Sequence, residues 1–174
     1  MRAVLTSACA AAALLGMSGC ATVAPGGAPA SGPAVPTSIA ISVGPCFGFC
    51  PVYDVKLSAD GAVAFTGARH TAVLGSRERR TTPETYRAVA ADLAPFRPAD
   101  GTTAEVPCAI AMSDMPTYTI TWTDTNGGQT VATHKGGCRD GAGQDLDVVL
   151  HGVPERLGIE AWMHQTTRPG VSRG

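Results

Sequence analysis

The strongest chemical signal in this chain is a pair of cysteines separated by three residues. Cys46 and Cys50 enclose Phe47-Gly48-Phe49, and Pro51 follows directly. Two nearby thiols can form a structural disulfide, exchange electrons with another thiol pair or bind a soft cation such as Cu(I). The residue types alone therefore leave structural, redox and metal-binding roles open for this segment.

The same segment resembles the Cys-x3-Cys-Pro pattern of Sco-type copper chaperones. That resemblance implies a distal histidine, for which His70 or His134 is available, and a thioredoxin-like βαβ frame. A strand rather than a helix is predicted after Pro51, so the frame differs. We therefore favour a structural disulfide between Cys46 and Cys50. A periplasmic thiol-redox or copper-handling protein that uses these two cysteines is the alternative function.

Two further cysteines flank a predicted β-hairpin. Cys108 precedes the hairpin, its turn lies near Asn126, and Cys138 follows it. Four cysteines allow three pairings. Because a hairpin brings its flanks together, we favour a Cys108–Cys138 disulfide beside the Cys46–Cys50 pair, in an oxidising compartment.

The N-terminus has the layout of a secretory signal peptide over residues 1–19. Arg2 precedes an apolar stretch that is too short to span a bilayer and ends in Met17-Ser18-Gly19-Cys20. These four residues resemble the lipobox of bacterial lipoproteins, although leucine is usual where Met17 stands. The resemblance implies cleavage before Cys20 and lipid chains on that residue. The alternative is an ordinary secretory signal with Cys20 as a spare thiol.

Lipidation of Cys20 predicts a protein of the cell envelope that faces the periplasm. Its partners would be the membrane, through the lipid, and an unknown envelope protein or small ligand. Ala21, where aspartate would signal retention, resembles the sorting signal of outer-membrane lipoproteins. Residues 20–37 are rich in Ala, Pro, Gly and Ser and carry no charge. Such a composition is typical of a tether.

The folded domain is predicted over residues 38–165, with a loose tail at 166–174. Thr82-Pro83 begins a helix that ends before Pro95. Residues 145–163 are also helical in pattern, kinked or split by Gly152 and Pro154. Apolar alternation predicts strands at 39–43, 52–57, from 63, at 117–123 and at 129–134, with a further strand at 70–74.

This order of elements lacks the regular alternation of strands and helices that parallel sheets require. We therefore expect an α+β fold. It would consist of an antiparallel β-sheet with two helices packed on one face, braced by disulfides.

Other candidate sites are weak. The four histidines lack ligand spacing such as HExxH. Asp145 and Asp147 are predicted to cap a helix rather than to form an acid–base pair, and the basic run at 77–80 is predicted to be a solvated loop. We expect no catalytic residue, no metal and no cofactor. The net charge of −1 argues against nucleic-acid binding.

Aromatic residues supply the remaining candidate. Phe47, Phe49 and Tyr53 lie within or just after the Cys46–Cys50 segment. If exposed, they would form an apolar surface for a partner. We therefore expect a non-catalytic binding or structural domain, with these rings as its candidate partner surface.

The octapeptide Cys46-Phe47-Gly48-Phe49-Cys50-Pro51-Val52-Tyr53 resembles a motif of the bacterial family DUF6438. Asp60-Gly61 and the following strand fit the Asp-Gly hairpin of that family, and Asp114-Met115-Pro116 fits its later Asp-x-Pro element. The resemblance covers residues 39–162. It implies no catalytic residue, and Cys108 and Cys138 lie outside the family pattern.

Overall fold

The computed structural model describes residues 36–166. The predicted signal peptide at 1–19, the lipidation site Cys20, the predicted tether up to residue 35, and tail residues 167–174 lie outside this range. Pro36 already belongs to the first strand, so regular structure begins before the predicted domain start at residue 38. Within the described range, no helix is long and apolar enough to cross a membrane.

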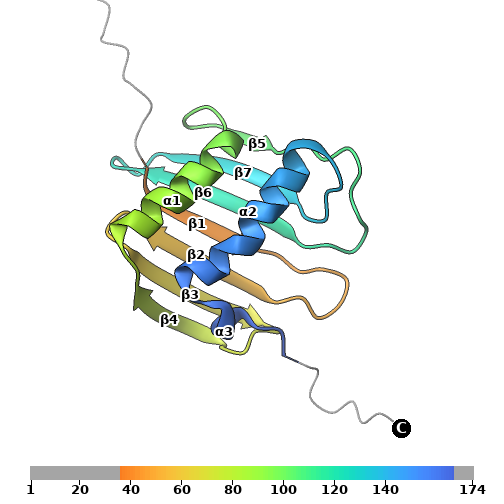
Figure 1. Cartoon of the computed structure of the whole chain (residues 1–174), viewed down its shortest axis with the longest axis horizontal. Coiled ribbons are helices and arrows are strands. Elements are labelled where there is room, and N and C mark those ends of the chain that lie inside the picture. Colours follow the sequence, from red (N-terminus) through yellow and green to blue (C-terminus); the bar gives the residue numbers. More distant parts are fainter. Residues whose placement is uncertain (1–35, 167–174) are drawn as a thin grey trace, which may run out of the picture. The chain divides into compact units, whose positions relative to one another are not determined.

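A seven-stranded sheet forms one layer of the domain, in the order β4-β3-β2-β1-β6-β7-β5 (Figure 1). β1 is central and pairs antiparallel with β2 and β6, so that Ile41 lies opposite Val55 on one side and Ile120 on the other. The strands are β1 Pro36–Val43, β2 Val52–Ser58, β3 Ala62–Arg69, β4 Gly75–Arg80, β5 Thr103–Glu105, β6 Thr117–Asp124 and β7 Gln129–Lys135.

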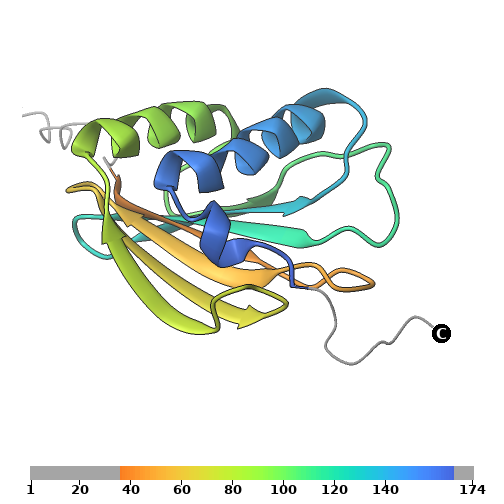
Figure 2. The same cartoon turned by 60° about the horizontal axis from the view of Figure 1, so that its bottom comes forward.

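Helices form the second layer. Figures 1 and 2 show α1 (Pro83–Leu93) and α2 (Gly141–Leu157) side by side over the sheet. A 3-10 turn, η1 (Ala94–Phe96), extends α1, and the short α3 (Glu160–Met163) follows α2. α1 begins as predicted, because the Thr82 hydroxyl accepts a hydrogen bond from the N–H of Thr85.

The central strands bury alternate residues, as the pleat of a strand requires. In β2, Tyr53, Val55 and Leu57 are buried, whereas Asp54 and Lys56 are exposed. The buried side chains pack with those of the helices, and removal of this apolar surface from water drives folding. The core includes Phe65, Leu93, Ile120, Trp122, Leu146 and Ile159.

The structure contains the predicted sheet and helices, and both cysteine pairs lie at disulfide distance, but the sheet is mixed rather than purely antiparallel. β5 pairs with β7 in parallel, with Ala104 opposite Ala132. The chain leaves β5 at the end of the sheet where β6 begins and turns back through residues 106–116. β5 therefore runs opposite to β6 and parallel to β7. Its three residues are all exposed, so no apolar alternation signals it.

Three other expectations differ from the structure. The run at 77–80, expected to be a loop, lies in β4, an exposed edge strand whose charges hinder pairing with other chains. The strand expected at 70–74 is the turn between β3 and β4. α2 begins at Gly141 and continues through Gly152 and Pro154, and the Pro154 side chain is buried. The break falls at the left-handed Gly158 instead.

Candidate functional site

Several loops that the sequence singled out meet at one end of the sheet, which we call the disulfide end. It comprises the loops at 44–51, 70–74, 106–116 and 136–140. Backbone hydrogen bonds join them: the N–H of Phe47 donates to the carbonyl of Asp114 at 3.3 Å, and the N–H of Gly44 donates to the carbonyl of Thr117 at 2.9 Å. Segments far apart in the sequence therefore form one surface.

Both disulfides lie at this end. Cys46 and Cys50 close the loop after β1, and Cys108 and Cys138 join the 106–116 segment to the loop after β7; the Cα atoms are 5.7 Å apart in each pair. The N–H of Met112 also donates to the carbonyl of Gly137 at 2.9 Å. The second disulfide therefore reinforces a segment that has little regular structure of its own.

Exposed apolar side chains gather at the disulfide end. Among the described residues, six large apolar side chains are exposed, and five of them lie here: Phe47 (87%), Leu74 (68%), Ile110 (58%), Phe49 (38%) and Met112 (37%). The sixth, Val148, lies on α2. These five side chains are spread over three loops of the disulfide end, at 44–51, 70–74 and 106–116.

Tyr53, which we expected to share that surface with Phe47 and Phe49, is only 7% exposed. It occupies a core-facing position of β2, and its ring packs against Phe65 with centroids 5.4 Å apart. Alternation along the strand, rather than proximity to Cys50, decides where this ring points.

Tyr53 instead lines a cavity of about 280 Å³, which we call the tyrosine pocket. Two loops of the disulfide end contribute to it: Cys50 and Pro51 from one, and Met115 and Pro116 from the other. β1, β6, α2 and the α3 region supply the rest of the wall: Val43, Tyr118, Leu150, His151, Pro154, Glu160 and Met163. The wall is mainly apolar and includes no lysine or arginine.

Two phenols, those of Tyr53 and Tyr118, are among the polar groups of this pocket. Burial raises the pKa of Tyr53 well above its ordinary value, and the nearby Tyr118 raises it further. Burial also raises the pKa of Tyr118, as does the negative charge of Asp147. Both hydroxyls therefore stay protonated at neutral pH and can donate hydrogen bonds.

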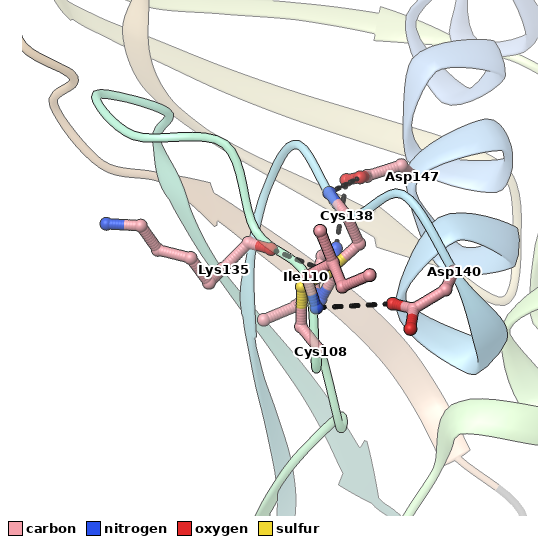
Figure 3. The surroundings of a disulfide bond; sticks show 7 residues. Cys108, Ile110, Lys135, Cys138, Asp140 and Asp147 are labelled. Carbon is pink, nitrogen blue, oxygen red and sulfur yellow. Dashed lines mark hydrogen bonds and ion pairs between the residues drawn. A yellow bond between two sulfur atoms is a disulfide. The ribbon is translucent and has the colours of Figure 1, made fainter.

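Behind Tyr118 lies a buried polar cluster that the sequence reasoning missed. The Asp147 carboxylate contacts His134 Nε2 at 2.9 Å through one oxygen and accepts the backbone N–H of Cys138 at 2.7 Å through the other. Figure 3 shows Asp147 reaching from α2 to Cys138, beside the Cys108–Cys138 bond. The His134 ring is fully buried and stacks on Tyr118, with centroids 6.2 Å apart.

We had expected Asp147 to cap a helix. It lies instead inside α2, on the buried side of that helix. Its neighbours at helical spacing, Gly143, Leu146, Leu150 and Pro154, are buried too. A carboxylate on an otherwise apolar stripe was the signal available in the sequence, because a buried charge requires partners.

Gly143 allows α2 to approach this cluster. A Cβ atom at this position would lie 2.5 Å from Cys138 Sγ and 2.9 Å from the carbonyl oxygen of Pro107. Any larger residue would push the helix away from the disulfide. Gly143 therefore has a packing role here.

The Cys46–Cys50 pair gathers no comparable set of groups. His70 lies near this loop, where its ring meets Phe49 edge-on with centroids 5.1 Å apart. Within residues 36–166, the only close group of three His, Cys, Asp or Glu ligands is His134, Cys138 and Asp147. His134 therefore belongs with the other cysteine pair.

Comparison with known proteins supports the resemblance seen in the sequence. The model of the family described as domain of unknown function (DUF6438) matches residues 37–155, from β1 to near the end of α2. No curated protein matches the chain. No solved structure matches it either.

Asp147→Ala should lower the free energy of unfolding of the oxidised protein by about 2–5 kcal/mol, because it leaves His134 Nε2 and the Cys138 N–H buried without a partner. Urea denaturation measures this loss. The exposed neighbour Asp145 provides the matched control, and Asp145→Ala should change stability by less than about 0.5 kcal/mol. Equal effects of the two substitutions would contradict the role given to Asp147.

Stability should fall as the pH rises above about 10. The pKa values of Tyr53 and Tyr118 are raised in the folded protein, so the folded state binds more protons than the unfolded chain in this range. Their contribution is complete below the unfolded pKa and is lost as the pH approaches the folded values. Urea denaturation at several alkaline pH values should show this slope, and Tyr53→Phe with Tyr118→Phe should reduce it. An unchanged slope in the double variant would refute the assignment.

Proposed function

Because this chain belongs to the DUF6438 family, whose description assigns no activity, we propose its function from its own residues. We propose a cell-envelope lipoprotein that lipid on Cys20 holds to the membrane, facing the periplasm. Its domain binds a small apolar ligand in the tyrosine pocket and catalyses no reaction. The outer membrane is the proposed location, from the residue at position 21.

One observation carries the binding role. The two segments that underlie the family resemblance lie far apart in the sequence, yet both line the tyrosine pocket: Cys50, Pro51 and Tyr53 from the first, and Met115 and Pro116 from the second. Four of the five exposed apolar side chains of the disulfide end, all but Leu74, lie on loops that also supply this wall. A binding site explains why these features occur together.

The lining specifies the ligand chemistry. A cavity of about 280 Å³ suits a small molecule. The apolar wall favours an apolar body, and the protonated Tyr53 and Tyr118 hydroxyls favour a hydrogen-bond acceptor such as a carbonyl oxygen. With no lysine or arginine in the wall, an anionic group is disfavoured.

The proposal of a non-catalytic role rests on the kinds of group in the pocket. Apart from the two phenols, the ionisable side chains in the wall are those of His151 and Glu160, and both residues are exposed. Within residues 36–166, neither side chain forms a hydrogen bond or ion pair that would orient it as an acid, base or nucleophile. Binding therefore accounts for the pocket with fewer assumptions than catalysis.

Lipidation predicts that the mature protein partitions into the detergent phase and carries lipid on Cys20, as detected by mass spectrometry of its N-terminal peptide. Cys20→Ser should abolish both properties. Met17→Leu installs the residue usual in a lipobox and should preserve them. A wild-type protein with a free Cys20 thiol would rule out this anchor.

The neutral naphthyl ketone prodan, an apolar fluorophore with one carbonyl, is a suitable probe of the pocket. We expect saturable binding with blue-shifted emission. His151→Trp should weaken binding about tenfold or more by filling the pocket, and Tyr53→Phe with Tyr118→Phe should weaken it about 2- to 12-fold through lost hydrogen bonds. His164→Trp, an exposed change outside the pocket, is the matched control. Binding that none of these substitutions affects would disprove ligand binding at this site.

A further inference from the structure

Cys138 lies within a group of side chains whose chemistry the tyrosine pocket does not use. The ligand atoms of His134, Cys138 and Asp147 all lie within 4.8 Å of one another, and all three residues are buried. Cys108 is bonded to Cys138 and adds a second sulfur. Two sulfurs, one imidazole nitrogen and one carboxylate oxygen are thus held at a single place.

We propose that this group is a redox-gated zinc site: once the Cys108–Cys138 disulfide is reduced, Cys108, Cys138, His134 and Asp147 bind one Zn²⁺. The ion accepts sulfur, imidazole and carboxylate ligands and favours four of them in a tetrahedron. In the disulfide form, the sulfurs are bonded to each other and cannot act as thiolates. Only one nitrogen and one oxygen are then offered, too few for a closed structural site.

The present positions are close to those that the ion requires. Bond lengths of about 2.0–2.3 Å to zinc place neighbouring ligand atoms about 3.4–3.8 Å apart in a tetrahedron. His134 Nε2 and the nearer Asp147 oxygen are 2.9 Å apart, and the other separations within the trio do not exceed 4.8 Å. Shifts of about 1 Å, within the range of side-chain rotation, therefore suffice for these three ligand atoms. Once reduced, the sulfurs of Cys108 and Cys138 must separate from about 2 Å to about 3.8 Å, which rotation of the two side chains can supply.

The redox step balances. The disulfide takes two electrons and two protons from a dithiol, which closes to its own cyclic disulfide, and Cys108 and Cys138 become thiols. Zinc binding then releases the two thiol protons. The formal charge of the site is the same before and after, because Zn²⁺ compensates the two thiolates and leaves the charge of Asp147. Reduction followed by zinc binding therefore adds no net charge to the protein interior.

Two further contacts suit His134 and Asp147 to this role. The second Asp147 oxygen keeps the Cys138 N–H bond of 2.7 Å, which orients the carboxylate while its first oxygen turns to the metal. The His134 ring is also held in place, because its Nε2 meets the first Asp147 oxygen and its face stacks on Tyr118. An ion bound at Nε2 therefore requires little rotation of the imidazole.

A zinc ion here would replace the covalent Cys108–Cys138 bond with a link through two metal–sulfur bonds. The Cys108–Cys138 bond holds the 106–116 segment, which supplies Met115 and Pro116 to the tyrosine pocket. With zinc bound, the same two cysteines remain joined through the metal. The segment would then stay attached under both oxidising and reducing conditions.

The test uses the full-length protein in detergent, reduced with a dithiol and freed of it without air. We expect one equivalent of Zn²⁺ per chain after reduction, and a large loss of affinity in the oxidised protein. Co²⁺ should give the intense visible bands of a tetrahedral site and a thiolate charge-transfer band in the near ultraviolet. Cys46→Ser with Cys50→Ser, which removes the other pair, is the matched control and should bind as the wild type does.

The ligand variants decide the assignment. Asp147→Asn should weaken zinc binding at least about 100-fold, and Cys108→Ser should halve the thiolate charge-transfer intensity per cobalt. Circular dichroism of oxidised Asp147→Asn checks its fold. If reduction unfolds the wild type, Zn²⁺ should restore its spectrum. Absence of that recovery, absence of bound zinc in the reduced protein, or loss of binding only in the Cys46/Cys50 variant would each overturn the proposal.

Discussion

The structure of the disulfide end depends on the contacts of one buried group, the carboxylate of Asp147. It lies on α2 and binds two groups from the sheet side, the ring of His134 on β7 and the backbone N–H of Cys138 in the loop that follows. A carboxylate deprived of water is stable only with such partners. Because both oxygens are engaged, the position of α2 relative to β7 is fixed by hydrogen bonding as well as by apolar packing. Gly143, one turn earlier, leaves the space that this approach requires.

The tyrosine pocket follows from that arrangement. Tyr118 stacks on His134, so the ring that Asp147 holds also supports one of the two phenols. Cys138 carries the disulfide that attaches the 106–116 segment, from which Met115 and Pro116 reach the pocket. A short polar network thus determines the shape of a mainly apolar cavity. Networks of this kind gain their strength from the low dielectric constant around them, which makes each missing partner costly.

Short sequence patterns predicted the strands and helices that are specified by their own residues. The alternation of Tyr118, Ile120 and Trp122 identified β6, and Thr82-Pro83 identified the start of α1. The strands β4 and β5 were not predicted, because all their residues are exposed and their positions depend on pairing with neighbouring strands. The pocket could not be predicted, since Cys50, Met115 and His151 come together only through long-range packing. Asp147 was noticed in the sequence but given the wrong role, because helix capping was weighed without the apolar stripe around it.

The direction of β1 determines at which end of the sheet the chain enters the domain. This strand of eight residues enters the sheet at Pro36 and ends at Val43, which lines the tyrosine pocket. At about 3.3 Å per residue, it carries the chain about 25 Å from one end of the sheet to the other. Any force that holds the residues before Pro36 therefore acts on the end away from the pocket. A segment or partner joined to the domain at Pro36 therefore meets it at the opposite end of β1 from Val43, and so leaves the pocket-lining end of this strand uncovered.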